Sequence, residues 1–304
     1  MSSFWHGVLP AITTPFDESL AVDSSLVAEH CDRMLAAGCA GVIPAGSLGE
    51  GATLSADEKL ELVRTCAEAV GERGAVVPGI AALSTAEAVS LARGAEQAGA
   101  TGLMVLPPYA YSTDWREMRA HVRAVIGATG LPCILYNNPV AYGTDFLPEQ
   151  IAELAAELPN LEAVKESSTD VRRVTELKRL LDDRLAILVG VDDLIVEGVG
   201  AGAVGWVAGL VNAFPEEALR LFELSRAGRA AEARELYEWF LPLLRLDTVP
   251  KLVQLIKLVQ ELTGQSPARV RPPRLELTPE ERAEVTALVD TALASRPLAG
   301  VGGT

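Results

Sequence analysis

The feature that most constrains the fold is a regular alternation of short apolar runs with amphipathic stretches over the first two-thirds of the chain. The eight apolar runs are 8–12, 41–44, 75–80, 102–106, 133–136, 161–165, 186–189 and 203–207. Near-continuous apolar runs are typical of strands that are buried on both faces of a parallel sheet. Eight such strands alternating with helices predict an α/β fold, a (β/α)8 TIM barrel.

The stretches between the runs carry signals of helix boundaries. Helices are predicted at Ser24–Ala37, Ser55–Val70, Thr85–Ala98 and Asp114–Ala128. Ser55 stands three residues before Glu58, which is the spacing of a capping box, and Thr85 is the predicted N-cap of the next helix. An open, doubly wound sheet is the alternative fold. It would normally carry a glycine-rich dinucleotide loop after its first strand, and none follows residues 8–12.

From about Glu223 onward the pattern is helical without strands. Three helices are predicted there, at Ala230–Leu244, Val249–Leu262 and Pro279–Ala294. We therefore divide the chain into a catalytic barrel, residues 1–222, and a C-terminal helical region, residues 223–304, that packs on the barrel.

Composition argues against several classes of protein. The formal net charge of −15 disfavours nucleic acid and anionic membrane surfaces as partners. The chain has only 3 histidines and contains no HExxH motif, no paired cysteines and no GxSxG motif, which disfavours a metal site and a serine hydrolase. We expect no metal and no cofactor.

Two observations bear on localisation. The 4 cysteines have no close metal-ligand spacing, which favours buried free thiols in a reducing compartment. The N-terminal residues show no signal-peptide pattern, and no apolar stretch approaches the roughly 18 residues that span a bilayer. The sequence therefore predicts a cytoplasmic protein.

Lys165 is the residue with the clearest chemical implication, because it ends the apolar run 161–165 in a chain that is poor in lysine. An ammonium group buried at a strand end costs several kcal/mol unless it is paired or deprotonated. Burial lowers the pKa of a lysine, and the neutral amine can then attack a carbonyl group. The alternative is a strand-end lysine that reaches water or pairs with Glu166.

Other unusual side chains also follow predicted strands, where a barrel builds its active site. They lie in Thr13-Thr14-Pro15-Phe16, Gly46-Ser47-Leu48-Gly49-Glu50, Tyr136-Asn137-Asn138-Pro139 and Val164-Lys165-Glu166-Ser167. Tyr136, on the strand next to Lys165, could pass protons during imine formation. Ser47 and the backbone N–H groups of Ser47 and Leu48 could hold a substrate carboxylate.

These segments, in this order and spacing, resemble the dihydrodipicolinate synthase / N-acetylneuraminate lyase family over nearly the whole chain, together with Gly190-Val191-Asp192-Asp193 and the segment from Asn212 to Pro215. The resemblance implies a Schiff base between Lys165 and a 2-oxo acid such as pyruvate, with Tyr136 and Ser47 as further catalytic residues. It also implies a homotetramer, a dimer of dimers, in which the loop with Tyr109 and Tyr111 crosses into the neighbour's active site and joins a proton relay. The candidate substrate-binding residues are Thr14, Gly46, Leu48, Gly49 and Val204.

Two departures from the family pattern bear on the reaction. The synthases of this family carry two adjacent threonines after the second strand, where this chain has Ser47 and Leu48, so one hydroxyl of the relay is absent. They also carry an arginine that grips the carboxylate of the aldehyde substrate, where this chain has Ala141. Alanine cannot replace a bidentate contact, so we predict that dihydrodipicolinate synthesis is slow.

The main prediction is therefore a catabolic Schiff-base lyase that acts on another 2-oxo acid or its cyclic imine. Such an enzyme could be a hydroxy-oxo acid aldolase, a sugar-acid dehydratase or a hydroxy-pyrroline carboxylate deaminase. Dihydrodipicolinate synthase is the alternative within the family. Two other interpretations stay open: a non-catalytic sugar-acid sensor, and a phosphate-binding barrel isomerase, which the glycine-rich segment 198–209 suggests.

Overall fold

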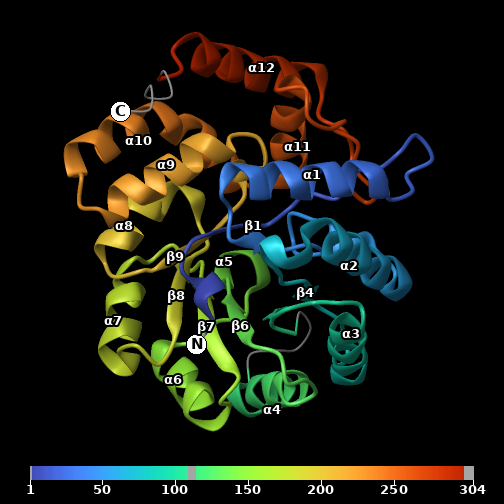
Figure 1. The fold of residues 1–304 in the computed structure, drawn as a ribbon, viewed down its shortest axis with the longest axis vertical. Helices are drawn as coiled ribbons and strands as arrows, with labels where there is room; N and C mark the ends of the chain where they lie inside the picture. Colours follow the sequence, from blue (N-terminus) through green and yellow to red (C-terminus); the bar gives the residue numbers. More distant parts are fainter. Residues whose placement is uncertain (1, 109–113, 298–304) are drawn as a thin grey trace.

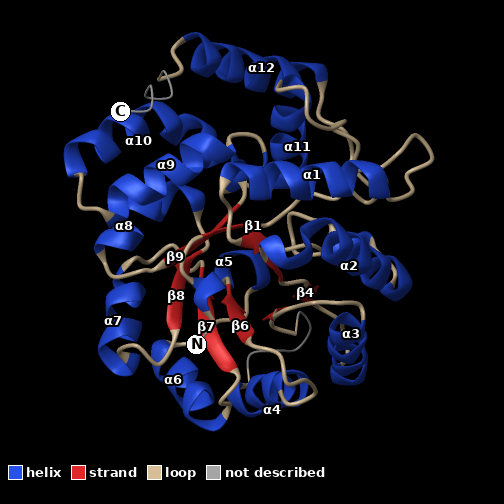
Figure 2. Cartoon of the chain, in the orientation of Figure 1, coloured by secondary structure: helices blue, strands red, loops and turns tan. Residues whose placement is uncertain are grey.

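The strands form a parallel barrel that is surrounded by helices in the computed structural model, which describes residues 2–108 and 114–297 (Figure 1, Figure 2). The strands are β1 (Val8–Pro10), β2 (Gly41–Val42), β3 (Ala75–Val76), β4 (Gly79–Ile80), β5 (Leu103–Val105), β6 (Cys133–Asn137), β7 (Leu161–Glu166), β8 (Ala186–Val189) and β9 (Gly205–Ala208). Nearly all their residues are buried, as expected for strands enclosed on both faces.

Backbone hydrogen bonds close the barrel. Seven strands form one sheet in the order β1-β9-β8-β7-β6-β5-β4, and β2 pairs with β3. The Ile43 N–H donates to the Pro10 carbonyl at 2.7 Å, and the Gly79 N–H donates to the Pro44 carbonyl at 2.9 Å. The predicted third strand is divided into β3 and β4 around Pro78, which has no N–H to donate. The ring thus has eight strand positions, and the predicted (β/α)8 TIM barrel is confirmed.

The helices of the barrel are α1 (Ser24–Ala37), α2 (Ala56–Val70), α3 (Thr85–Gln97), α4 (Trp115–Ile126), α5 (Pro139–Tyr142), α6 (Pro148–Glu157), α7 (Arg172–Leu181), α8 (Ile195–Gly200) and α9 (Pro215–Arg226). The predicted capping box of Ser55 and Glu58 begins α2. Thr85 was the wrong N-cap for α3. Ser84 caps this helix by accepting from the Glu87 N–H at 3.2 Å, because Thr85 is already its first helical residue.

Helices α10 (Ala230–Leu244), α11 (Leu252–Leu262) and α12 (Pro279–Ala294) gather with α9 on one side of the barrel in Figure 1. Two of the three predicted C-terminal helices have the predicted bounds. The remaining helix, α11, was predicted at Val249–Leu262 and begins instead at Leu252, because residues 249–251 form a bend and a turn. The domain boundary predicted between residues 222 and 223 falls inside α9.

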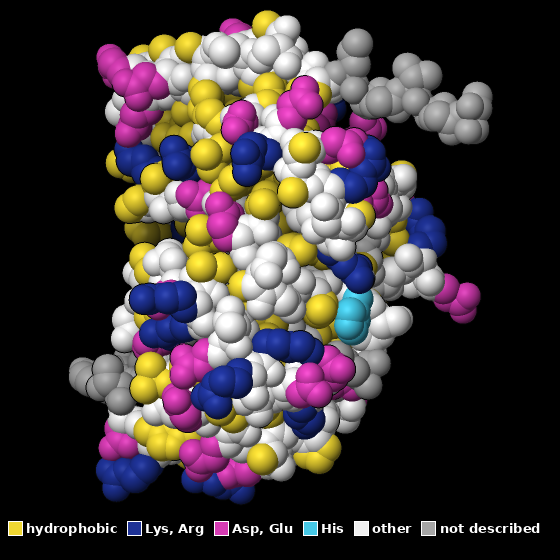
Figure 3. Space-filling view, turned by 90° about the vertical axis from the view of Figure 1, so that its left-hand side faces the viewer, with side chains coloured by type: hydrophobic (Ala, Val, Ile, Leu, Met, Phe, Trp, Pro, Cys, Tyr) yellow, Lys and Arg dark blue, Asp and Glu magenta, His cyan; other side chains and the backbone are white. Residues whose placement is uncertain are grey.

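Surface and cysteine chemistry agree with the composition. Within the described ranges, no helix combines the length and apolarity that a membrane-spanning segment needs. On the face that Figure 3 shows, basic and acidic side chains lie close together in small groups. The four cysteines are buried free thiols.

A buried ion pair joins the C-terminal helices to the barrel. Lys257 Nζ on α11 lies 2.6 Å from Glu50 Oε1 in the loop after β2, and the two side chains are 1% and 0% exposed. The second Glu50 oxygen accepts from the Arg271 N–H at 3.1 Å, and Lys257 also donates to the Arg269 carbonyl at 2.6 Å. Burial lowers the pKa of Lys257 to about 8, and the Glu50 carboxylate opposes this shift.

We predict that Lys257→Met lowers the free energy of unfolding by about 3–5 kcal/mol, because it removes the nearer, fully buried cation of the Glu50 carboxylate and leaves only Arg274 at 3.7 Å. Lys251→Met is the matched control, since Lys251 forms an exposed pair with Glu281, and it should cost at most about 1 kcal/mol. Urea unfolding followed by circular dichroism measures both values. Equal losses in the two variants would show that the buried pair does not stabilise the fold in this way.

Candidate active site

The carboxyl ends of the barrel strands surround a cavity of about 510 Å³. This volume is typical of a small-molecule site. Five of the residues predicted from sequence line it: Gly46, Ser47, Leu48, Tyr136 and Lys165. A further wall comes from residues 247–250, in the segment between α10 and α11. The cavity is therefore shared by the barrel and the C-terminal helical region.

Lys165 is placed by the pairing of β7 with its neighbours. It lies opposite Tyr136 on β6 and Leu188 on β8, and its side chain is only 6% exposed. Burial lowers the pKa of Lys165, which increases the fraction of neutral amine, while the Asp247 carboxylate opposes this shift. The Lys165 Nζ lies 4.0 Å from the centroid of the Tyr136 ring.

The end of β8 leaves room for the lysine because residue 190 is glycine. A Cβ atom at Gly190 would lie 2.5 Å from Lys165 Cε and 2.0 Å from Ser167 Oγ. Both distances are far below ordinary contact. Any larger residue here would push the lysine side chain out of its position, so this glycine is required by close approach.

Tyr136 is buried, and its hydroxyl accepts a hydrogen bond from Asn138 Nδ2 at 3.0 Å. Burial raises the pKa of Tyr136, so the phenol stays protonated near neutral pH and can donate a proton. The ring packs edge-on against Tyr142, with centroids 5.7 Å apart. The proton-transfer role predicted for Tyr136 is compatible with this position.

The loop after β2 has the geometry of an anion site. The backbone N–H groups of Ser47 and Leu48, which line the cavity, donate to no acceptor among the described residues, so they can bind a ligand. Glu50 follows in the left-handed conformation, with φ of 53°, and its carboxylate is held by Lys257. The buried ion pair thus fixes the loop that was predicted to hold the substrate carboxylate.

Three predicted substrate-binding residues do not line the cavity. Thr14 donates to the Gly49 carbonyl at 2.7 Å, so these two residues support the loop from behind. Val204 precedes β9 at its amino end, where its N–H donates to the Ile187 carbonyl at 2.9 Å. Val207, near the carboxyl end of β9, lines the cavity instead. The prediction of Val204 chose the wrong end of the strand. Tyr109 and Tyr111 lie outside the described residues.

The structure adds Tyr142, which lines the cavity and to which the sequence analysis gave no role. It ends α5, and its hydroxyl hydrogen-bonds with Ser47 Oγ. Tyr136, Tyr142 and Ser47 therefore bring three hydroxyl groups to one side of the cavity within one chain. The sequence signal was present in Tyr-Asn-Asn-Pro-Val-Ala-Tyr-Gly, because α5 is a single turn that begins at Pro139.

Asp247 and Arg274 also line the cavity, and neither was predicted. Ala141 lies in the wall as expected, at the position where an arginine grips the second substrate in the synthases. Arg172 and Arg173, which could in principle supply that contact, are instead paired with Asp170 and Asp145. Arg274 is 27% exposed, and its Nη1 lies 3.7 Å from Glu50 Oε2.

Comparisons with known proteins agree with this geometry. The profile of the Dihydrodipicolinate synthetase family matches residues 5–292. The chain belongs to this family. Its members are class I lyases, and the protein is therefore a lyase that works through a lysine Schiff base.

Two curated relatives share the printed name 4-hydroxy-tetrahydrodipicolinate synthase. The protein of Haloarcula marismortui is 31% identical over 277 residues, which cover 91% of this chain and 90% of the relative. The protein of Methanopyrus kandleri is 33% identical over 272 residues, which cover 89% of this chain and 91% of the relative. Both alignments cover nearly the whole of this chain and of the relative.

Solved structures of the family superpose closely on this chain. The 4-hydroxy-tetrahydrodipicolinate synthase of Methylacidiphilum fumariolicum SolV gives a TM-score of 0.90 at 30% identity, covering 95% of this chain and 97% of its own. The prophage protein YagE of E. coli K12, solved in complex with pyruvate, gives a TM-score of 0.89 at 25% identity, covering 95% of this chain and 98% of its own.

We predict that Tyr142→Phe slows proton transfer at C3 of pyruvate by about 100-fold, because it removes the hydroxyl that contacts Ser47 and keeps the ring that packs on Tyr136. The readout is deuterium incorporation into the methyl group of pyruvate in D₂O, followed by NMR. Tyr237→Phe is the control, since its hydroxyl bonds the Asp193 carbonyl outside the cavity. An unchanged exchange rate in Tyr142→Phe would exclude this hydroxyl from the proton pathway.

Proposed function

We propose that Lys165 condenses with the 2-oxo group of pyruvate or another 2-oxo acid, and that the protonated imine then serves to make or break a bond at C3. The observation that carries this proposal is the position of the Lys165 amine. It is buried at the end of β7, lines the cavity and lies 4.0 Å from the centroid of the Tyr136 ring. Few lysines meet all these conditions without a chemical role.

The chemistry follows from the iminium group. The neutral amine attacks C2, the former carbonyl oxygen leaves as water after it gains two protons, and a positively charged C=N bond remains. This bond withdraws electrons from C3, so that a C3 proton can leave or the C3–C4 bond can break, with the electron pair moving to nitrogen. Hydrolysis of the imine returns the amine. Tyr136 is the nearest candidate to transfer the protons, and its raised pKa keeps it a donor.

The loop at residues 46–49 would hold the C1 carboxylate of the 2-oxo acid. The N–H groups of Ser47 and Leu48 and the Ser47 hydroxyl provide donors for an anion without a charged side chain. This leaves the rest of the substrate to extend past Lys165 toward the opposite wall. The identity of that part decides which reaction of the family the protein catalyses.

Two reactions remain candidates. The names of the relatives favour 4-hydroxy-tetrahydrodipicolinate synthase over the catabolic reactions, and Arg274 supplies a cation in the cavity wall that an aldehyde substrate's carboxylate could reach. Ala141 and Asp247, which both line the cavity, favour the catabolic lyase. Ala141 cannot form an ion pair with that carboxylate, and an ionised Asp247 would repel it. We favour a 2-oxo acid lyase with a hydroxylated or cyclic imine substrate, and synthase is the second candidate.

A homotetramer, as a dimer of dimers, stays a prediction for this chain, as does a cytoplasmic location. A solved relative at 25% identity is described as the first monomeric variant of dihydrodipicolinate synthase, so family members differ in oligomeric state. Because Ser47, Tyr136 and Tyr142 come from one chain, the described part of the site already contains several hydroxyl groups.

Borohydride reduction in the presence of pyruvate tests the imine. We predict one reduced pyruvyl adduct, mapped to Lys165 by peptide mass spectrometry, with loss of activity. Lys165→Arg should give no adduct, because arginine stays protonated and cannot attack a carbonyl. If the protein were a sensor or a phosphate-binding isomerase, the unmodified protein would give no adduct. Absence of an adduct in the unmodified protein would therefore rule out the proposed chemistry.

Steady-state kinetics separates the two reactions. We predict that aspartate semialdehyde with pyruvate is a poorer substrate pair than hydroxylated 2-oxo acids or hydroxy-pyrroline carboxylate, by about 30- to 1,000-fold in kcat/KM, because the bidentate contact is absent. Ala141→Arg should then increase kcat/KM for the semialdehyde, and Ala141→Gln should not. A semialdehyde preference in the unmodified protein, lost on Arg274→Ala, would instead establish the synthase.

A further inference from the structure

Asp247 is a charged side chain in the cavity that the proposed imine chemistry does not use. It ends the short 3₁₀ helix η6 (Arg245–Asp247), which connects α10 to α11. Its carboxylate packs against the carboxyl end of β9, since a Cβ atom at Gly209 would lie 2.1 Å from Asp247 Oδ1. Glycine at position 209 therefore allows the carboxylate to reach the barrel strands.

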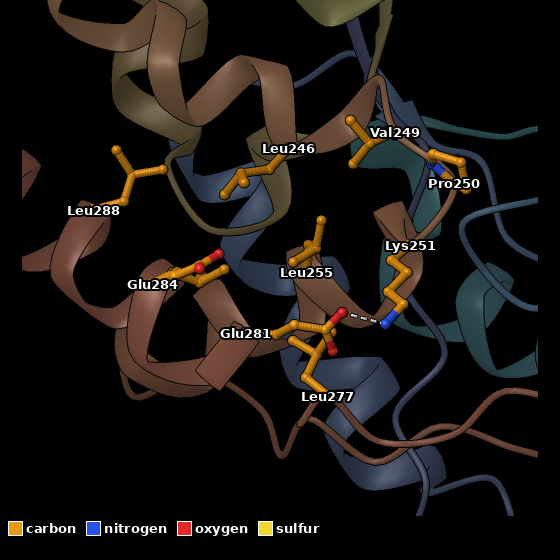
Figure 4. A pocket seen from close by; sticks show the side chains of 10 residues that line it. Leu246, Val249, Pro250, Lys251, Leu255, Leu277, Glu281, Glu284 and Leu288 are labelled. Carbon is orange, nitrogen blue, oxygen red and sulfur yellow. Dashed lines mark hydrogen bonds and ion pairs between the residues drawn. The ribbon is translucent and has the colours of Figure 1, made fainter. Parts of the chain in front are cut away.

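The neighbouring residues hold Asp247 in this inward orientation. Leu246 lines a second, mainly apolar cavity of about 520 Å³ between η6, α11 and α12, and Asp247 lines the cavity of Lys165. Figure 4 shows Leu246, Leu255 and Leu288 around this second cavity, with the Lys251–Glu281 ion pair at its edge. Turning Asp247 outward would remove Leu246 from apolar contacts, so the segment has one favourable orientation.

Asp247 differs from Asp192, the fully buried carboxylate near Lys165. Asp192 accepts hydrogen bonds from Trp206 Nε1 at 3.0 Å, from the Gly209 N–H at 3.1 Å and from the Leu210 N–H at 2.7 Å, so its oxygens are occupied. Among the described residues, none donates a hydrogen bond to the Asp247 carboxylate. Burial and the Asp192 charge raise the pKa of Asp247, while the positive charge at Lys165 lowers it and favours the ionised carboxylate.

The position of Asp247 relative to the proposed anion loop gives it a place in substrate binding. The C1 carboxylate would bind at the loop of residues 46–48 and C2 at Lys165, so the atoms beyond C3 would occupy the rest of the cavity, whose lining includes Gly190, Gly209 and Asp247. A hydroxyl or protonated amine there would donate to an acceptor that receives no other hydrogen bond from the residues that the structure describes. A second carboxylate there would meet a like charge instead.

We propose that Asp247 is a specificity-determining residue that selects 2-oxo acids with a hydrogen-bond donor, a hydroxyl or protonated nitrogen, beyond C3 and disfavours those with a second carboxylate. The inference rests on the proposed imine with Lys165. It places the residue that selects the substrate in the C-terminal helical region rather than in the barrel.

The test compares imine formation with four acids, measured as the concentration that gives half-maximal borohydride trapping. The probes are pyruvate, 2-oxobutanoate, 4-hydroxy-2-oxobutanoate and 2-oxoglutarate. In the unmodified protein, the 4-hydroxyl should improve trapping about 10- to 100-fold over 2-oxobutanoate. In Asp247→Asn this advantage should fall to less than about 3-fold, and trapping of 2-oxoglutarate relative to pyruvate should increase about 10-fold.

Ratios within each variant separate specificity from indirect effects. Loss of the Asp247 charge also changes the charge state of Lys165, but that effect is common to all four acids and cancels in the ratios. Asp193→Asn is the matched control, because Asp193 is a neighbouring carboxylate that does not line the cavity and should keep the unmodified ratios. Asp247→Ser provides a second substitution and should behave as Asp247→Asn.

The outcomes are distinguishable. Opposite shifts for the hydroxylated acid and for 2-oxoglutarate support the assignment. A uniform change for all four acids, or no change, overturns it, because Asp247 would then act only through Lys165 or not at all. Absence of any pyruvate adduct in the unmodified protein refutes the proposed function itself, and this inference with it.

Discussion

The buried ion pair between Glu50 and Lys257 connects the two parts of the molecule on which the site depends. Glu50 ends the loop that is proposed to bind the substrate carboxylate through the N–H groups of Ser47 and Leu48, and Lys257 lies on the helix that follows the wall with Asp247. Because both charges are removed from water, each requires the other, and α11 cannot shift relative to the loop without exposing or separating them. This interaction therefore constrains the distance between two walls of the cavity in which the substrate is proposed to bind.

Lys165 has an environment that balances two opposing effects. Burial favours the neutral amine, which is the nucleophile, while the carboxylates of Asp247 and Asp192 favour the charged form. In the proposed protonated imine the nitrogen carries a positive charge, which the same carboxylates would stabilise. The arrangement thus suits a group that must be neutral when it attacks and positively charged afterwards.

Much of this could be predicted from sequence, for reasons that particular residues make clear. Apolar runs fix the strands, and the residues directly after a strand must lie at the barrel mouth, which is why Lys165, Tyr136 and Ser47 were found together. Val204 was misplaced because an apolar run does not show where its strand ends, and Val207 lines the cavity instead. Asp247 and Arg274 lie in the connections between the C-terminal helices. No strand precedes them there, so the sequence does not show that they reach the barrel mouth. Their approach to the barrel depends on tertiary packing alone.

The position of α9 has a consequence for how such enzymes diversify. This helix continues across the boundary between the barrel and the later helices, and those helices supply one wall of the cavity while the strands supply the nucleophile. An exchange of the C-terminal helical region between two family members would therefore transfer the residues that are proposed to recognise the distal half of the substrate. Lys165 would stay unchanged. Recombination at this point could generate new substrate ranges in one step, provided that the acceptor barrel keeps a glutamate to meet the incoming lysine.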